Sequence, residues 1–189
     1  MIILASSSPR RAQILQQLGF EFRIEHPACD EAIHGIPIES IPEELAKRKA
    51  LEVSARFPKD FVLGSDTLVF CDSKALSKPK NGEEAFEMLK MLKNKTHKVI
   101  SGVAFCKNNE VLFSNYACTQ VIFRDYADSE ILNYISTMEY ADKAGAYGVQ
   151  EKGARFVKSI NGCFYNVMGL PVALTIDALS CIEHFKEKE

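Results

Sequence analysis

The chain has 189 residues, of which 47% are hydrophobic and 25% charged, and its formal net charge is -2. This composition is typical of a globular protein, and the length suffices to bury a sizeable core. A net charge near zero argues against general nucleic-acid binding, which favours a strongly basic face, but it allows a local basic pocket for a small anion. We expect one domain over residues 1–189, built of two lobes that do not fold independently.

The sequence predicts neither a leader nor a membrane segment. The apolar run Ile2–Ala5 has no basic segment before it, and no apolar stretch approaches the ~20 residues that span a bilayer. The six cysteines form no C-x-x-C pair and the four histidines do not cluster with them, which argues against a structural zinc site. We expect reduced thiols, mostly packed in strands, in a cytoplasmic protein without a membrane partner.

The first predicted elements are a strand at Ile2–Ala5 and a helix that follows it. Ser8 is expected to cap this helix, and Pro9 suits its first position, where the missing N–H has no partner. Arg10 and Arg11 then lie in the first turn, where the partial positive charge of the helix disfavours them unless an anion binds. The alternative is that both are solvated surface cations.

The middle of the chain predicts alternating helices and strands. Residues 21–39 look irregular, and a second helix is expected from Ser40 with the capping box SIPE. Residues 61–70 predict a buried strand, and Asn81 is expected to begin a third helix. Strands that alternate with helices early in the chain indicate an α/β fold.

The later elements add long β segments. Residues 97–106 and 110–123 predict an antiparallel hairpin, and Asp128 is expected to cap a fourth helix. Residues 154–169 predict two strands around a tight turn at the dipeptide NG, and Pro171 opens the last helix. Together the elements predict an α/β protein with a central mixed sheet and flanking helices.

Asp66 breaks the pattern of its strand. It lies between Leu63 and Leu68 in an apolar run, where an unpartnered carboxylate would be costly if buried. The nearby Gly64 permits close approach of another backbone or of a ligand. Asp66 is therefore a candidate general base or metal ligand. The alternative is that it ends the strand and caps a turn.

Lys49 is the second exception. It is four residues from both Leu45 and Val53, so it shares a helical stripe with two apolar residues. The alternatives are a functional buried lysine and a side chain that extends along the apolar surface to water.

Several polar groups are expected at one edge of the sheet. Ligands of open α/β sheets bind beyond the carboxyl ends of strands, and Ser6–Arg11 follows one such end while Asp66 is near another. Cations, hydroxyls, a helix N-terminus and carboxylates suit a polyphosphate held with a divalent metal, although no P-loop motif is present. The groups that this arrangement offers are Ser6, Ser7, Ser8, Arg10, Arg11, Glu31, Lys49, Asp66, Lys78 and Lys80.

Four stretches resemble the Maf family of nucleoside triphosphate pyrophosphatases. They are LASSSPRRAQIL, GSDTLV, KPKNGEEAFEML and DKAGAYGVQEKGARFVKSINGCFYNVMGLP, in the family's order and across essentially the whole chain. The resemblance implies an elongated, inosine-triphosphatase-like fold with two lobes around a cleft. It also implies hydrolysis of a nucleoside triphosphate to the monophosphate and pyrophosphate with a divalent metal, Mg²⁺ or Mn²⁺.

The resemblance implies roles for individual residues. The aspartate of the family's G-x-D-T strand is assigned as the base, and it corresponds to Asp66. The sequence by itself does not separate the role of base from that of metal ligand. Glu31 corresponds to a second acidic ligand, and Lys49 and Lys78 correspond to the catalytic lysines. The two arginines of the family's S-P-R-R motif correspond to Arg10 and Arg11, which places them at the substrate phosphates.

The stretch KAGAYGVQ resembles the branch that prefers dTTP and UTP rather than the branch that prefers 7-methyl-GTP. Selectivity for the base would then rest on Arg10, Thr67 and Gln150. Two departures from the family pattern, Ser65 and Ser101, are small changes that leave the resemblance intact.

Two other functions remain open at this stage. A nucleotide-binding regulator of cell division or septum formation would bind nucleotide and release no pyrophosphate. A phosphatase that removes the terminal phosphate would release orthophosphate and a diphosphate. In every case the expected partner is a nucleoside triphosphate, canonical or modified, and the resemblance is compatible with a homodimer.

Overall fold

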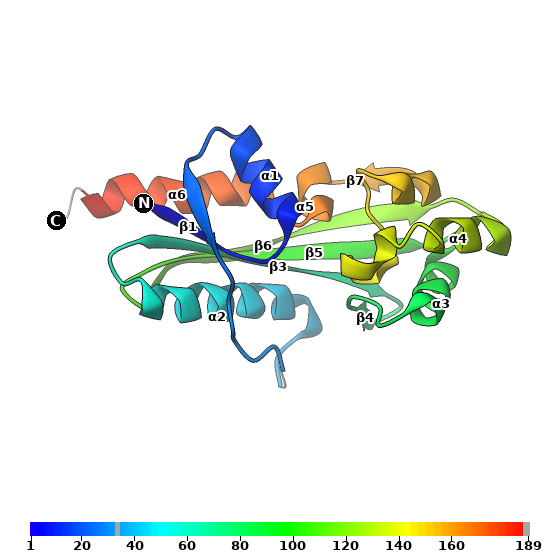
Figure 1. Cartoon of the computed structure of the whole chain (residues 1–189), viewed down its shortest axis with the longest axis horizontal. Helices are drawn as coiled ribbons and strands as arrows, with labels where there is room; N and C mark the ends of the chain where they lie inside the picture. The colour runs from blue at the N-terminus through cyan, green and yellow to red at the C-terminus, as the bar shows by residue number, and fades with distance from the viewer. Residues whose placement is uncertain (33–34, 187–189) are drawn as a thin grey trace. The chain divides into compact units, whose positions relative to one another are not determined.

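The computed structural model describes residues 1–32 and 35–186. Its strands are β1 (Ile2–Ala5), β2 (Phe22–Glu25), β3 (Phe61–Cys71), β4 (Lys74–Leu76), β5 (Thr96–Lys107), β6 (Glu110–Phe123) and β7 (Val157–Asn161). They form a sheet in the order β2-β1-β3-β5-β6-β7, with β4 paired to β3 (Figure 1). β1 runs parallel to β2 and β3, whereas β4 is antiparallel to β3 and β7 to β6. The expected α/β class with a mixed sheet is confirmed.

The helices lie between these strands in the chain, except for the last two, which follow β7. The α-helices are α1 (Pro9–Gln17), α2 (Ile41–Arg56), α3 (Gly82–Leu92), α4 (Asp128–Ile135), α5 (Phe164–Met168) and α6 (Val172–Lys186). The 3-10 helices are η1 (Ile38–Ser40), η2 (Glu139–Asp142), η3 (Ala144–Ala146) and η4 (Lys152–Phe156). Among the described residues, no helix combines the length and the apolar character that crossing a bilayer requires.

The chain divides into two compact units. Unit 1 comprises Met1–Asp66, Ser101–Ala117 and the chain from Gly169 onward, and unit 2 comprises Thr67–Ile100 and Cys118–Met168. Strands β3, β5 and β6 contribute residues to both.

The core of unit 1 forms where α2 packs closely against the sheet. A Cβ built on Gly64 would collide with the Ala46 carbonyl and the Ala50 side chain, and one on Gly102 would collide with the backbone of Glu43. Glycines at these two strand positions therefore let the helix backbone approach the strands directly. The buried residues of this core are Ile3, Ala5, Ala46, Ala50, Val53, Val62, Ala104 and Cys106.

The core of unit 2 contains an aromatic group around His97. The His97 ring meets the rings of Phe123 and Tyr147 edge-on, and its Nε2 lies 2.8 Å from the Tyr147 hydroxyl. Burial lowers the pKa of His97 from 6.5 to about 4, so the ring is neutral at physiological pH.

Most of the predicted elements are present. The expected hairpin is formed by β5 and β6, joined by Asn108 and Asn109, whose φ angles of 51° and 61° suit a tight two-residue turn. Asn81 caps α3 as expected, because its side chain accepts a hydrogen bond from the Glu84 amide at 2.9 Å. All six cysteines are free, but only Cys71, Cys106 and Cys118 lie in strands, fewer than expected.

The predictions for the starts of α2 and α4 are wrong. The capping box at Ser40 does not form, because η1 runs directly into α2 and gives Ser40 helical backbone angles. Glu43, its expected partner, instead accepts a hydrogen bond from the Ser114 hydroxyl at 2.7 Å. Asp128 is the first residue of α4 rather than its cap, and the preceding Ala127 amide donates to the Glu130 carboxylate at 3.1 Å.

Two segments have a different secondary structure from the prediction. Residues 21–39 are not irregular throughout, because they contain β2 and η1. Of the two strands expected in residues 154–169, β7 is the one that forms. The residues expected to form the second strand form the helix α5 instead. The buried Asn166 amide donates to the Val99 carbonyl at 3.0 Å and to Thr119 Oγ1 at 2.9 Å. These bonds attach α5 to β5 and β6 within unit 2.

Candidate active site

The central feature of unit 1 is a lysine held between two carboxylates. Lys49 Nζ lies 2.5 Å from Asp66 Oδ1 and 2.7 Å from Glu31 Oε1. The side chains of Lys49 and Asp66 are each 11% exposed, whereas that of Glu31 is 61% exposed. Asp66 is thus an interior residue of β3 with an ionic partner, and the interpretation as a turn cap is wrong. Lys49 binds these carboxylates rather than extending to water.

Local packing explains how the sequence brings this pair together. Asp66 lies two residues after Gly64, so the two positions face the same side of β3. Because Gly64 admits the backbone of α2 at Ala46 and Ala50, Lys49 on the same part of α2 lies within reach of Asp66.

The electrostatics keep Lys49 charged. Burial by itself lowers the pKa of Lys49, but the charge and hydrogen bond of Asp66, together with the hydrogen bond to Glu31, outweigh it, so the pKa is raised. Lys49 therefore remains an ammonium at neutral pH and cannot serve as a base. It supplies a fixed positive charge to an anionic ligand.

Arg11 is a buried cation that makes structural hydrogen bonds within unit 1. It is 8% exposed, its Nε donates to the Gly169 carbonyl at 2.8 Å and its NH1 donates to Ser6 Oγ at 3.0 Å. Ser65 Oγ donates to the same Gly169 carbonyl at 3.0 Å. Burial lowers the pKa of Arg11, although the charge of Asp66 opposes this. The interpretation of Arg11 as a solvated surface cation is wrong.

The serines before α1 form local bonds that differ from the prediction. Ser8 occupies the cap position, but its side chain makes no capping bond, and its amide donates to Ser6 Oγ at 3.1 Å. Ser7 Oγ lies 3.0 Å from His26 Nδ1 at an exposed position. Arg10, the neighbour of Arg11, is partly exposed. In unit 1, Ser6 thus bonds to Arg11 and Lys49 pairs with Asp66 and Glu31, and the charge of Arg11 interacts with those of Lys49 and Asp66.

The other predicted site residues belong to unit 2. Thr67 directly follows Asp66 and is partly buried. Lys78 and Lys80 are exposed on either side of the buried Pro79, and the Lys80 amide donates to Glu84 Oε2 at 2.7 Å. Gln150 donates from Nε2 to Glu151 Oε1 at 3.2 Å.

The carboxylates of unit 1 fit a divalent metal in part. Residues 1–32 and 35–186 hold no group of three or more histidine, cysteine, aspartate or glutamate side chains arranged for a metal ion. Glu31 and Asp66 nevertheless converge on one cation, the Lys49 ammonium. Mg²⁺ typically binds one or two carboxylates together with substrate phosphates. Two converging carboxylates are therefore enough protein ligands for such a site.

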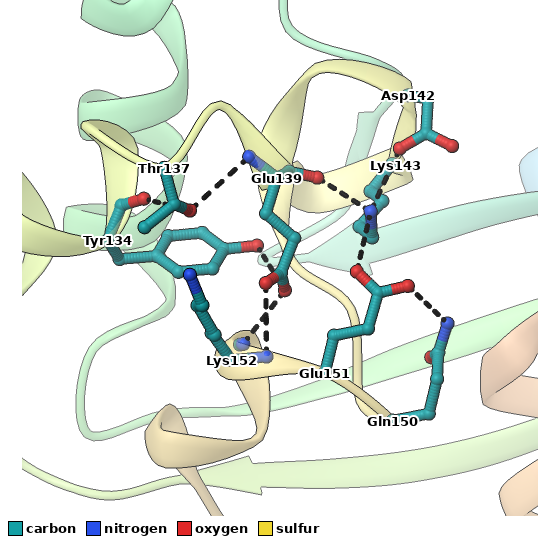
Figure 2. A network of polar contacts seen from close by, with 9 residues as sticks. Tyr134, Thr137, Glu139, Asp142, Lys143, Gln150, Glu151 and Lys152 are labelled. Carbon is teal, nitrogen blue, oxygen red and sulfur yellow. Dashed lines mark hydrogen bonds and ion pairs between the residues drawn. The ribbon is translucent and has the colours of Figure 1, made fainter.

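A second buried lysine was missed by the sequence analysis. Lys143 has a side chain that is 7% exposed and that pairs with Asp142 and Glu151 (Figure 2). Its segment has neither helical nor strand periodicity, so no pattern marked it as buried. The one available signal was a lysine in a run of small residues, AGAYG, where glycine leaves room for its stem.

Comparison with known proteins places this chain in a family. A family model described as "Maf-like protein" matches residues 1–182. The chain therefore belongs to the Maf family. A relative named dTTP/UTP pyrophosphatase in Clostridium perfringens (strain 13 / Type A) is 43% identical over 182 residues, which cover 94% of this chain and 95% of the relative.

Other relatives carry the same name. One from Geobacillus sp. (strain WCH70) is 45% identical over 177 residues, covering 93% of this chain and 94% of the relative.

A solved nucleoside-triphosphatase / dITP/XTP pyrophosphatase from Mycobacterium abscessus is 13% identical and matches with a TM-score of 0.42, over 65% of this chain and 73% of that one.

Proposed function

We propose that this chain is a nucleoside triphosphate pyrophosphatase that hydrolyses dTTP and UTP, or modified pyrimidine triphosphates, to the monophosphate and pyrophosphate. Membership of the Maf family and relatives of that name at 43% and 45% identity support the proposal. The observation that carries it is the buried Lys49–Asp66 pair with Glu31 beside it. A carboxylate can activate water or bind a metal, and an adjacent ammonium can offset the negative charge of a phosphoanhydride during its hydrolysis.

Asp66 has two possible roles in this reaction. As general base it would take a proton from the water that attacks the α-phosphorus, and the anhydride oxygen would leave with the β-phosphate. As a metal ligand, Asp66 would bind a divalent cation together with Glu31. In both roles Lys49 orients the Asp66 carboxylate and contributes positive charge.

Glu31 and Asp66 are the residues that would hold a divalent cation, Mg²⁺ or Mn²⁺. Such a cation would neutralise charge on the phosphate oxygens. The exposed Glu31 carboxylate can turn from Lys49 toward a cation at little cost, whereas Asp66 is buried.

The remaining contacts are assigned by the same proposal. Lys78 and Lys80 are exposed cations for phosphate oxygens, and Arg10 and Arg11 add positive charge at the start of α1. Thr67 and Gln150 are assigned to the base, together with Arg10. The hydroxyl groups of Ser6, Ser7 and Ser8 complete the phosphate contacts. We further propose a cytoplasmic homodimer.

The decisive experiment is a panel of nucleoside triphosphates incubated with the purified chain and Mg²⁺ or Mn²⁺, with products separated by chromatography. We expect monophosphate and pyrophosphate, fastest from dTTP and UTP, and no turnover in excess EDTA. Orthophosphate with a diphosphate would indicate a terminal phosphatase instead. Nucleotide-dependent thermal stabilisation without any product would indicate a binding regulator. Light scattering of the same sample tests the homodimer.

A further inference from the structure

Lys143 is a buried lysine whose Nζ has three oxygen partners, two by hydrogen bonds and one by an ion pair (Figure 2). It donates to the Glu139 carbonyl at 2.6 Å and to Asp142 Oδ1 at 2.9 Å, and it pairs with Glu151 Oε2 at 3.2 Å. A Cβ on Gly148 would lie 2.6 Å from Lys143 Cε, so a glycine at this position leaves the room that the lysine stem occupies.

Glu139 fixes the backbone on the other side of Glu151. One carboxylate oxygen of Glu139 accepts from the Tyr134 hydroxyl at 3.2 Å and from the Gly153 amide at 3.0 Å, and the other accepts from the Lys152 amide at 3.1 Å. The segment that carries Glu151 is thus held from both sides, by the Lys143 ion pair and by these backbone bonds (Figure 2).

Glu151 in turn fixes the amide of Gln150. Its Oε2 pairs with Lys143, while its Oε1 accepts from Gln150 Nε2 at 3.2 Å. An ionised carboxylate only accepts hydrogen bonds, so the amide nitrogen of Gln150 must face it and the amide oxygen must face away. The reversed amide would put oxygen against a carboxylate that Lys143 holds in place.

We propose that Glu151, anchored by Lys143, is a positioning residue that orients the Gln150 amide and thereby selects uracil and thymine over cytosine. The proposal rests on the proposed function and on its assignment of Gln150 to the base. A fixed amide offers one oxygen acceptor and one remaining N–H donor in a set order. Uracil and thymine match that order with the N3–H donor beside the O4 acceptor.

Cytosine requires the opposite arrangement. It presents an N3 acceptor beside the N4 amino donor, so it would pair only with the reversed Gln150 amide. Uracil and cytosine have nearly the same outline, so pocket size does not separate them. The preference for UTP over CTP therefore isolates the orientation of the amide from the shape of the pocket.

The test compares kcat/KM for UTP and for CTP, measured by pyrophosphate release, in the wild type and in Glu151→Gln and Lys143→Met. Gln150→Ala and Lys152→Ala complete the set. The ratio of the two constants does not depend on the fraction of folded enzyme, so a merely structural defect leaves it unchanged. We expect Glu151→Gln and Lys143→Met to lower the UTP:CTP ratio by about three- to tenfold, the worth of one ordinary hydrogen bond. Lys152→Ala removes a neighbouring exposed charge and should keep the wild-type ratio.

Coupling to Gln150 supplies the second criterion. In a Gln150→Ala background, Glu151→Gln should change the ratio no further, because its effect passes through that amide. An unchanged ratio in Glu151→Gln and Lys143→Met, an equal effect in both backgrounds, or a wild type indifferent between UTP and CTP would overturn the proposal. Calorimetric binding of UMP and CMP gives a ratio of affinities, which tests the same base preference without turnover. A wild type that releases no pyrophosphate refutes the proposed function, and UMP and CMP affinities then decide the orientation by themselves.

Discussion

Lys49 Nζ lies 2.5 Å from Asp66 Oδ1, in an ion pair whose two side chains are each only 11% exposed. A buried pair of this kind contributes little net stability, because its attraction repays the loss of hydration only in part. Removing one partner alone is costly, since the other is left as an uncompensated charge. The pair thus ties the stability of unit 1 to the residues proposed for catalysis, and the two effects must be measured separately.

Asp66→Asn should abolish most turnover while the protein remains folded. The amide has the same shape and can still offer an oxygen to Lys49, but it cannot take a proton or supply a full charge to a metal. We expect kcat to fall by at least about a hundredfold, the lower range for a positioned acid–base group. Steady-state pyrophosphate release, normalised to circular dichroism of the same samples, measures this. A folded Asp66→Asn protein with near-normal kcat would remove Asp66 from the catalytic assignment.

Lys49→Met should destabilise the chain strongly, because Asp66 then keeps a buried charge without its cation. The expected loss is about 3–5 kcal/mol in the free energy of unfolding, measured by urea titration at pH 7. Lys47→Met on the same helix is the matched control. Lys47 pairs with Glu44 at 3.0 Å, with both side chains about a third exposed, and such pairs contribute about 1 kcal/mol or less.

A double variant separates charge from packing at Lys49. Adding Asp66→Asn to Lys49→Met replaces the isolated carboxylate by a neutral amide, so part of the lost stability should return. Should the double variant be as unstable as the sum of the single changes, lost packing rather than the unpaired charge would account for the effect.

Arg11→Ala should lower stability even without substrate. The side chain makes two charge-assisted bonds, to the Gly169 carbonyl and to Ser6 Oγ, and their joint loss should cost about 2–4 kcal/mol. Urea unfolding of the apo protein measures it, and Gln13→Ala, an exposed change on α1, should stay within about 0.5 kcal/mol of the wild type. Unchanged stability in Arg11→Ala would show that these bonds contribute nothing to the fold.

The sequence identified the site residues that violate a local rule and missed those that do not. Asp66 in an apolar strand and Lys49 in an apolar helical stripe stand out by pattern, and the structure pairs them. Glu31 lies on an exposed loop, where an acidic residue is ordinary, so its own signal was weak and the family resemblance was needed to give it a role. Lys143 was missed because its partners come from the short 3-10 helix η2 and from Glu151, just before η4, and no periodicity predicts these segments.

Helix caps show why local motifs can mislead. Ser8 and Ser40 both have the residue type that caps a helix, yet neither side chain does so. At Ser40 the preceding backbone explains the outcome, because η1 ends there and gives this residue helical angles. Ser8 has the extended angles of a cap and still makes no capping bond. The strand β2 was not predicted, because the four residues that pair with β1 are too few to show an alternating pattern.

The burial of His97 makes the stability of the chain sensitive to acid. The ring is 2% exposed, and burial lowers its pKa from 6.5 to about 4 in the folded protein. Between these values the unfolded chain binds a proton that the folded chain does not. The contribution of His97 is therefore fully present above pH 6.5 and is lost as the pH falls toward 4.

His97→Gln should reduce that acid sensitivity. At about 1.4 kcal/mol for each pH unit between 6.5 and about 4, the wild type should lose about 3 kcal/mol through His97 that the variant retains. Urea unfolding at several pH values from 7 to 4 measures both proteins, and the carboxylates, which titrate in both, cancel in the difference. His26→Gln, at an exposed histidine, should follow the wild-type curve. If the wild type and His97→Gln lose stability in parallel down to pH 4, His97 takes up its proton without unfolding the aromatic group around it.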